Sequence, residues 1–259
     1  MKKFFWVFTV LFTVTIGSSV FCEKLNSPFS LSGELSVFSK YLWRGTLLTN
    51  GPVCQPSVTI GFREVSVNVW GNSDLDDAND HAMNFTELDY TLDYTHSFSF
   101  LNVSAGVIHY RFPYTGGAKT TEIYAGVGLN VPGNLSLTIN RDVDAVEGTY
   151  GTLNMSTNIP MGLTKVEASG SVGFASKNYA MNCYCYHDIT TGKSYGPENV
   201  SLTDALFTVG FPFSIGKLMT IVPSVSVTSL INSDARTAYS KQKLDATNVA
   251  MGITVTESF

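Results

Sequence analysis

The sequence predicts an all-β fold, a single antiparallel transmembrane β-barrel of about twelve strands with short periplasmic turns and long extracellular loops. The first reason is a two-residue period, clearest over residues 85–95, where acidic and threonine side chains alternate with leucine and tyrosine. Successive side chains of a strand point to opposite faces, so this stretch has one polar and one apolar face. The second reason is that the connections between such stretches are alternately short and long. The third is composition, because charged residues make up 14% of the chain, against about a quarter in soluble domains.

Six strands are expected in the first half of the chain, over residues 34–44, 57–63, 65–70, 85–95, 101–107 and 122–130. Each has one apolar parity, and a helix would spread those residues around its circumference instead. In chain order the apolar sets are Leu35, Val37, Tyr41 and Trp43; Val58, Ile60 and Phe62; Val65, Val67 and Val69; Leu88, Tyr90, Leu92 and Tyr94; Leu101, Val103, Ala105 and Val107; Ile123, Ala125, Val127 and Leu129.

Six more strands are expected over residues 135–140, 152–159, 165–174, 205–211, 220–231 and 249–255. Their apolar sets are Leu135, Leu137 and Ile139; Leu153, Met155 and Ile159; Val166, Ala168, Val172 and Phe174; Ala205, Phe207, Val209 and Phe211; Ile221, Val225, Val227 and Ile231; Val249, Met251, Ile253 and Val255. Pro223 lies inside the eleventh strand, and because proline cannot donate to a strand ladder we expect a β-bulge there.

Short and long connections alternate along the chain. Tight turns are expected near residues 63–64, 97–98, 132–133, 160–162 and 212–217, and long connections over residues 45–55, 71–84, 113–119, 142–148, 176–201 and 232–245. In an antiparallel sheet, alternate connections lie at the same end. The short ones are therefore expected on the periplasmic side and the long ones on the extracellular side, as in bacterial outer-membrane barrels.

Both ends of the chain carry targeting features. Residues 1–22 are expected to be a cleaved signal peptide, because Lys2 and Lys3 precede an apolar run that ends near Ile16. An N-terminal anchor helix is the alternative, but the run is short for a membrane span. The barrel then occupies residues 23–259. The final Phe259 follows a strand of alternating apolar residues, which resembles the C-terminal sorting signal read by the outer-membrane assembly machinery; Glu257 departs from that signal.

The polar parity places charged side chains inside the barrel. The residues expected to line the pore are Lys40, Arg44, Arg63, Glu87, Asp89, Asp93, Glu122, Lys165 and Glu167. Rings of charged side chains filter solutes by sign, so the acidic excess predicts a mild cation preference. The alternative is an ion-pair network that plugs the lumen, because twelve strands lie between the filled eight-stranded and the open sixteen-stranded barrels.

Five aromatic residues fall on the apolar parity and are expected at the membrane interface, where such rings gather. They are Tyr41, Trp43, Phe62, Tyr90 and Tyr94.

The residues that could bind metal give no regular motif, and neither a metal site nor a cofactor is predicted. Four aspartates between residues 74 and 80 lack the ordered spacing of an EF-hand, which favours a solvated acidic loop. Cys54, Cys183 and Cys185 fall in expected extracellular loops, where disulfides persist. A bond from Cys54 to one of the other two, metal capture by the pair with His187, and unpaired thiols all stay open.

Several motifs together resemble a known family. They are Tyr41-Leu42-Trp43-Arg44-Gly45, Gly51-Pro52, Gln55-Pro56, Val69-Trp70-Gly71, Glu87-Leu88-Asp89-Tyr90, residues 106–110 and Glu122-Ile123-Tyr124. In this order and spacing they resemble the TorF-like porin family of bacterial outer-membrane proteins. The resemblance covers most of the mature chain and implies a location and an architecture more than an activity. The long loop over residues 176–201 is not part of the family's pattern.

The function expected from these features is that of a porin or narrow passive diffusion channel for small solutes in the outer membrane of a Gram-negative-type cell. A closed barrel whose extracellular loops bind ligands or surfaces is the alternative. An outer-membrane hydrolase is a third class, for which His109 and His187 are the candidate bases. Neither has a serine in a nucleophile-like context, so no enzyme is predicted. The expected partners are outer-membrane lipid or lipopolysaccharide, the assembly machinery and small solutes; no nucleic-acid motif is present.

Overall fold

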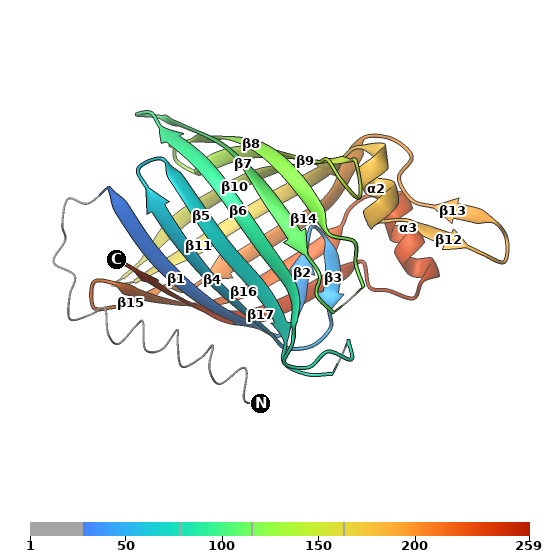
Figure 1. The fold of residues 1–259 in the computed structure, drawn as a ribbon, viewed down its shortest axis with the longest axis horizontal. Coiled ribbons are helices and arrows are strands. Elements are labelled where there is room, and N and C mark those ends of the chain that lie inside the picture. The colour runs from blue at the N-terminus through green and yellow to red at the C-terminus, as the bar shows by residue number, and fades with distance from the viewer. Residues whose placement is uncertain (1–27, 78, 115, 163) are drawn as a thin grey trace.

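A computed structural model describes residues 28–259 with the exception of residues 78, 115 and 163. The expected signal peptide, residues 1–22, lies outside the described residues. The described chain forms a closed antiparallel β-barrel with a cluster of loops and short helices at one end (Figure 1). This confirms the fold class predicted from the alternating sequence pattern.

Twelve strands of the described chain form the wall. They are β1 (Phe29–Phe38), β4 (Val53–Phe62), β5 (Val65–Asp74), β6 (Phe85–Ser97), β7 (Leu101–Arg111), β8 (Thr120–Leu129), β9 (Leu135–Asp142), β10 (Thr149–Met161), β11 (Thr164–Ala175), β14 (Ser201–Gly210), β16 (Met219–Leu230) and β17 (Thr247–Ser258). Consecutive wall strands pair antiparallel, and β17 pairs with β1, so the sheet has no free edge between its first and last strands. Closure satisfies the backbone hydrogen bonds that lipid cannot.

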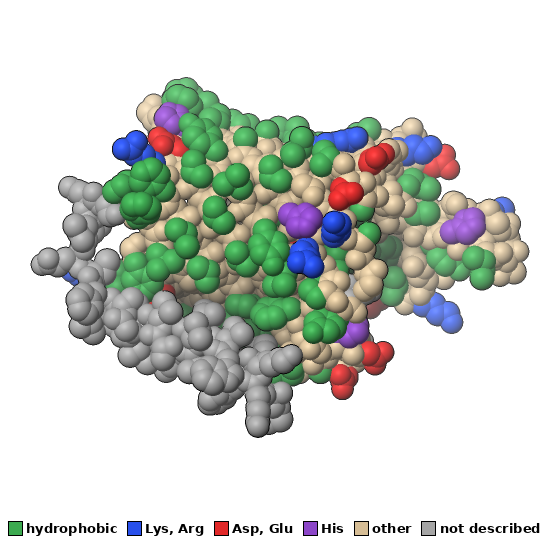
Figure 2. Space-filling model, in the orientation of Figure 1, with side chains coloured by type: hydrophobic (Ala, Val, Ile, Leu, Met, Phe, Trp, Pro, Cys, Tyr) green, Lys and Arg blue, Asp and Glu red, His purple; other side chains and the backbone are tan. Residues whose placement is uncertain are grey.

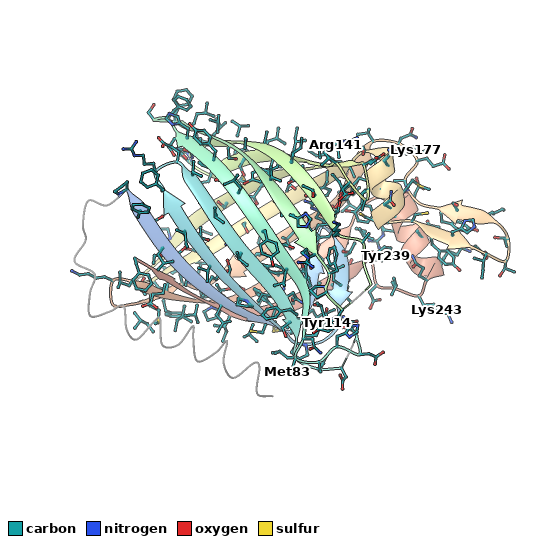
Figure 3. All side chains as sticks on the ribbon, viewed as in Figure 1. Met83, Tyr114, Arg141, Lys177, Tyr239 and Lys243 are labelled. Atoms are coloured by element: carbon teal, nitrogen blue, oxygen red, sulfur yellow. The ribbon has the colours of Figure 1, made fainter. Side chains whose placement is uncertain are left out.

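The remaining elements lie in the connections. They are β2 (Tyr41–Trp43), β3 (Thr46–Thr49), α2 (Lys177–Cys183), β12 (Tyr186–Asp188), β13 (Lys193–Tyr195), β15 (Phe213–Ile215) and α3 (Ser233–Lys241). All except β15 gather at the end that carries the long connections, which we call the loop end (Figure 1). Met83, Tyr114, Lys177 and Lys243 mark this end (Figure 3). No helix of the described residues is long and apolar enough to cross a membrane.

The outer wall is apolar. Side chains on the expected lipid-facing parity are strongly exposed, among them Ile60 at 57%, Leu92 at 52% and Met251 at 61%. On the face shown in Figure 2, apolar side chains are spread over the wall, and most acidic and basic ones lie near its two ends. This is the surface that a barrel presents to lipid.

Pro223 lies inside a strand, as the sequence predicts, but the β-bulge expected there does not form. The pairing of β16 with β17 runs through Pro223 opposite Ile253 without a shift in register, so the expected bulge is absent from that ladder. The interruption is in the neighbouring strand instead. There β14 ends at Gly210 and the chain resumes as β15 at Phe213, while the Phe211 amide donates to the Pro223 carbonyl.

The first expected strand, residues 34–44, is also corrected. β1 ends at Phe38, and the chain then forms a separate hairpin, β2–β3. Arg44 and Gly45 occupy its two-residue turn with φ of 45° and 81°. Positive φ at both positions is the type I′ geometry that two-residue hairpins prefer, and the glycine at the second position makes it accessible.

Candidate functional site at the mouth of the barrel

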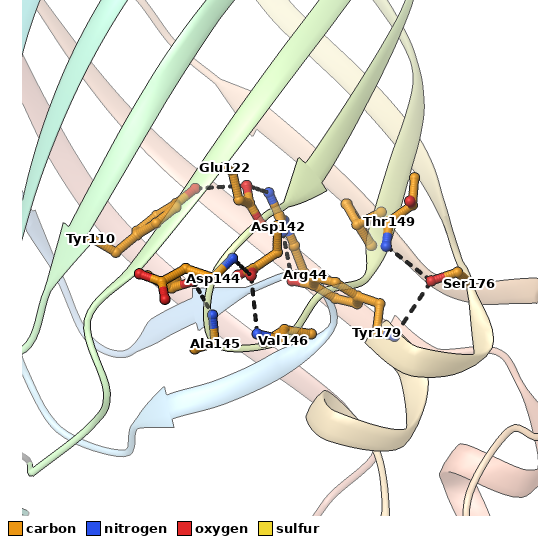
Figure 4. A network of polar contacts seen from close by, with 12 residues as sticks. Arg44, Tyr110, Glu122, Asp142, Asp144, Ala145, Val146, Thr149, Ser176 and Tyr179 are labelled. Atoms are coloured by element: carbon orange, nitrogen blue, oxygen red, sulfur yellow. Dashed lines mark hydrogen bonds and ion pairs between the residues drawn. The ribbon is translucent and has the colours of Figure 1, made fainter.

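The β2–β3 hairpin lies inside the loop end of the barrel (Figure 4). Tyr41 is buried and its hydroxyl donates to Glu87 Oε2 on β6 at 2.9 Å. The turn also approaches the opposite wall, because a Cβ added at Gly45 would lie 2.4 Å from the Cβ of Asp204 on β14. The first long connection therefore folds inward and narrows the mouth.

This placement corrects two of the aromatic predictions. Tyr41 points into the lumen, where it contacts Glu87, and does not face lipid. Trp43 packs against the buried residues at the mouth. The sequence predicts that both face outward, because they continue the parity of Val37. However, β1 ends at Phe38, and the separate β2–β3 hairpin turns these two side chains inward.

Arg44, at the tip of this hairpin, forms the central ion pair of the mouth. Its Nη1 and Nη2 donate to the two carboxylate oxygens of Glu122 on β8 at 2.7 and 2.8 Å. This bidentate arrangement is the strong form of the interaction. Tyr110 on β7 adds a hydrogen bond of 3.0 Å to the same carboxylate. Figure 4 shows Arg44 bridging from the wall to helix α2, where Nη1 also donates to the Tyr179 hydroxyl at 2.6 Å.

Aromatic rings surround the same guanidinium. Its central carbon lies 4.5 Å from the ring centroid of Trp43, 4.4 Å from that of Tyr150 and 5.4 Å from that of Tyr179. Cation–π contacts of this kind gain strength when they are desolvated. The hairpin tip is thus held by charge, hydrogen bonds and stacking from β8, β10 and α2 together.

Helix α2 closes over the hairpin from the long 176–200 connection. Ser176 caps its first turn by accepting a hydrogen bond from the Tyr179 amide. Burial raises the pKa of the Tyr179 hydroxyl well above its usual range and that of the Cys183 thiol to about 11, so both are neutral at pH 7. Just beyond the helix, the Tyr184 hydroxyl donates to the Arg44 carbonyl at 2.9 Å.

Two glycines of the wall allow tyrosines to reach across a strand. Tyr150 on β10 donates to both oxygens of Asp204 at 3.1 Å, and a Cβ on the intervening Gly173 would lie 2.3 Å from the Tyr150 hydroxyl and from Asp204 Oδ2. Tyr124 on β8 likewise reaches Asp93 on β6 across Gly106. In each case a tyrosine and a carboxylate two strands apart meet over a residue without a side chain.

A row of three acidic side chains lies along the inward face of β6. Glu87, near the loop end, is followed by Asp89 and Asp93, so the row spans about 20 Å of strand at roughly 3.3 Å per residue. Asp93 accepts from Thr95 at 2.8 Å as well as from Tyr124. Asp89 Oδ1 is buried and accepts no hydrogen bond from the described residues. These acidic side chains line one side of the lumen.

The opposite half of the lumen is open and polar. A cavity of about 700 Å³ is lined by Glu34, Glu167 and many serine and threonine side chains from strands around the barrel. Lys165 forms an ion pair of 2.9 Å with Glu167, and both side chains are largely accessible. Glu167, one of the residues expected to line the pore, therefore borders this cavity.

The predicted pore-lining residues thus fall into groups. Arg44, Glu87, Asp89 and Glu122 meet at the mouth, Asp93 lies farther along β6, and Glu167 borders the cavity with Lys165 beside it. Lys40 is half-buried between β1 and β2. Arg63 is corrected: it is exposed in the tight turn after β4, with its guanidinium 5.4 Å from the outward ring of Phe62, so it lies outside the lumen.

The other three predicted interface aromatics do lie on the outer surface. Phe62, Tyr90 and Tyr94 are 43%, 40% and 47% exposed. Phe62 also packs against Phe29 of the adjacent β1, with ring centroids 4.7 Å apart. Their role at the lipid headgroups stays a prediction.

The aspartate loop and the cysteines form structural contacts. Asp74 is fully buried and accepts from Thr49, Asn72 and Asn79 at 3.1, 3.0 and 2.9 Å, which ties the loop after β5 to the hairpin. Cys54, Cys183 and Cys185 are free thiols in the structure. Among the described residues no group of three or more His, Cys, Asp or Glu side chains is arranged to hold a metal ion.

The two histidines considered for catalysis have hydroxyl partners. His109 Nδ1 lies 3.0 Å from the Thr121 hydroxyl, and His187 Nδ1 lies 3.0 Å from the Ser194 hydroxyl on the β12–β13 hairpin. The adjacent Asp188 accepts from the amides of residues 190 and 191 rather than orienting the imidazole. This geometry stabilises a hairpin.

Sequence reasoning missed the residues that complete the mouth. Tyr110 and Tyr150 lie on the polar, inward parity of their strands, and that parity is the only feature of the sequence that indicates a position in the lumen. Asp204 immediately precedes an expected strand, and Tyr179 and Tyr184 lie in the longest expected loop, where no pattern distinguishes them from other tyrosines. Nothing local in the sequence indicates that these five side chains converge around Arg44.

Comparison with known proteins gives one family and a set of related folds. A family model described as "Bacterial protein of unknown function (Gcw_chp)" matches residues 23–208. No curated protein matches the chain. Among solved structures, the chain is similar to the NanC porin with a TM-score of 0.51 and 9% identity, over 88% of this chain and 98% of that one. At this identity the similarity shows the fold alone.

Two further solved structures give lower TM-scores. An outer-membrane channel from Pseudomonas putida F1 gives a TM-score of 0.44 and 8% identity, over 92% of this chain and 97% of that one. The translocator domain of autotransporter NalP from Neisseria meningitidis gives a TM-score of 0.40 and 8% identity, over 100% of this chain and 97% of that one.

Proposed function

We propose that this chain, which belongs to the bacterial Gcw_chp family, is an outer-membrane channel for small solutes whose extracellular mouth is narrowed by the β2–β3 hairpin. The observation that carries the proposal is the closed barrel with an apolar outer wall and a polar cavity of about 700 Å³ inside it. The fold shared with the NanC porin supports it. Transport here is passive diffusion, and the chain acts without a cofactor or a catalytic centre.

We propose in addition a mild preference for cations. The carboxylates of Glu87, Asp89 and Asp93 follow one another along the inward face of β6, while the guanidinium at the mouth, Arg44, is neutralised by Glu122. A passing cation therefore meets acidic side chains that have no basic partner, and acidic linings of this kind favour cations.

A closed barrel that acts through its extracellular loops is the second candidate. The packing at the loop end favours it, because Tyr150, Tyr179, Tyr184, Leu230 and Tyr239 form a buried apolar cluster across the mouth. The β12–β13 hairpin projects beyond this cluster, with Ile189 at its tip 89% exposed, and offers a surface for a ligand or another cell (Figure 1).

Conductance in a planar lipid bilayer separates the two. The channel proposal expects stepwise conductance and a reversal potential of cationic sign in a KCl gradient, reduced in Asp89→Asn. Asp188→Asn, an exposed loop carboxylate, is the matched control and leaves the potential unchanged. A complete lack of conductance by folded protein would favour the closed barrel, and anion selectivity would overturn the cation preference.

The partners and the finer family resemblance belong to the same proposal. We propose that lipopolysaccharide and lipid surround the apolar wall and that the assembly machinery recognises the terminal strand. In support, Phe259 follows β17 and exchanges backbone hydrogen bonds with Leu31 at the seam with β1. The Tyr41–Gly45 motif that resembles TorF-like porins forms the hairpin of the mouth, which suits a channel of that kind.

A further inference from the structure

A small cavity lies at the mouth beside the Arg44–Glu122 pair. Its volume is about 220 Å³ and its lining is mostly apolar. Aromatic rings form much of the wall, contributed by Trp43, Tyr110, Phe112 and Tyr179. Three carboxylates, those of Glu87, Glu122 and Asp142, complete the lining, and no lysine, arginine or histidine of the described chain lines it.

Two of the three carboxylates are already satisfied. Glu122 receives both guanidinium nitrogens of Arg44 and the Tyr110 hydroxyl. Asp142 Oδ1 accepts from the backbone amides of residues 144, 146 and 147 at 3.0, 3.0 and 3.2 Å, and its Oδ2 accepts from Thr120 at 2.6 Å. Glu122 is thus paired with a cation, and Asp142 is stabilised by four hydrogen bonds.

Glu87 is different. Its side chain is only 5% exposed, and its Oε2 accepts one hydrogen bond, from Tyr41. Its Oε1 accepts none from any described residue, and no cationic side chain pairs with it there. A buried carboxylate without a charged partner is costly. A cation bound in the cavity would remove that cost.

We propose that this cavity binds a small organic monocation, an ammonium group carried on an aromatic or aliphatic body. The ammonium donates to Glu87 Oε1, and the body packs against the rings of Trp43 and Tyr110, which also attract positive charge. The volume equals about seven water molecules at roughly 30 Å³ each, which limits the guest to about one ring with a short arm. Where the proposed channel activity holds, on which this role rests, such cations are the solutes captured before they reach Asp89.

Binding is testable without conduction. Isothermal titration calorimetry of the full mature protein in detergent at pH 8, with benzylammonium chloride as the probe, is expected to show saturable binding. Benzyl alcohol, which has the same ring without the charge, and benzoate, which has the opposite charge, are expected to bind at least tenfold more weakly. Equal binding of the alcohol would overturn the proposal, because Glu87 would then contribute nothing.

Variants assign the binding to this cavity. Glu87→Gln is expected to weaken benzylammonium binding at least tenfold, whereas Glu167→Gln, at the other end of the lumen, leaves it unchanged. Ala145→Phe fills the cavity from its lining and is expected to abolish binding even if the glutamine variant folds poorly. Unchanged binding in Ala145→Phe would show that benzylammonium does not bind in this cavity. A wild-type protein that binds benzylammonium but conducts no ions would retain the site and refute the channel proposal alone.

Discussion

At the scale of single residues, Arg44 has the largest set of partners at the mouth. Its guanidinium is joined to Glu122, Tyr179 and the surrounding rings, while its carbonyl accepts from Tyr184. The Glu122 side chain is 2% exposed and that of Arg44 12%. Removing one partner of an ion pair buried to this extent is strongly destabilising, because the other charge stays buried without a counter-charge.

Arg44→Ala is therefore expected to destabilise the protein by about 3–5 kcal/mol, the range for removing one partner of a buried pair. It is also expected to raise single-channel conductance, since the hairpin loses its anchor. Guanidinium titration followed by tryptophan emission measures the first effect and bilayer recording the second.

Arg63→Ala is the matched control, because Arg63 is exposed in a tight turn and its guanidinium lies beside the outward ring of Phe62. The double variant Arg44→Ala/Glu122→Ala should be less destabilised than the single one. A loss in Arg44→Ala no greater than in Arg63→Ala would show that the pair does not anchor the hairpin.

At the scale of elements, the wall follows from the sequence and the mouth does not. The two-residue period locates all twelve wall strands because each must present an apolar face to lipid. The same period misleads at the first strand: Val37, Tyr41 and Trp43 share one parity, although β1 ends at Phe38. Only the Arg44–Gly45 pair marks the hairpin. The mouth joins residue 44 to residues 122, 179 and 204, and such distant pairings leave no local pattern.

The tyrosine contacts across glycines give a prediction for one strand. A Cβ on Gly106 would lie 2.4 Å from the Leu92 carbonyl oxygen and 2.6 Å from the Tyr124 ring and hydroxyl. Gly106→Ala is therefore expected to cost about 1–3 kcal/mol through overpacking. The midpoint of guanidinium unfolding in detergent measures it.

Gly128→Ala is the control on the neighbouring strand, since its nearest side-chain atoms are 3.9 and 4.0 Å from the added Cβ. An alanine there is expected to be tolerated or to stabilise by about 0.4–1 kcal/mol. Equal stability of the two variants would contradict the close packing of Tyr124 over Gly106.

At the scale of the whole molecule, the two ends of the barrel differ. Short turns and the C-terminus lie at one end, and the hairpin, both helices and the long connections lie at the other (Figure 1). The lumen repeats this asymmetry, because packed tyrosines and the Arg44–Glu122 ion pair fill the loop end while a cavity of about 700 Å³ occupies the opposite half. The lumen is thus narrow at the loop end and wider at the opposite end.

Orientation in the membrane follows from this asymmetry and can be checked on intact cells. An epitope inserted after Gly192, in the exposed turn of the β12–β13 hairpin, is expected to bind antibody added outside. The same epitope inserted between Arg63 and Glu64, in a tight turn at the other end, is expected to bind only after permeabilisation. Labelling of the second insertion on unbroken cells would reverse the assigned orientation.

The position of the hairpin also dictates an order of assembly. β2 and β3 are synthesised early, yet the groups that contact Arg44 and Gly45 belong to later strands and a helix, as far along as Leu230, which is 185 residues after Gly45. The mouth therefore packs fully only when the wall is nearly complete, and a chain that ends before these segments lacks the partners that hold the hairpin in place.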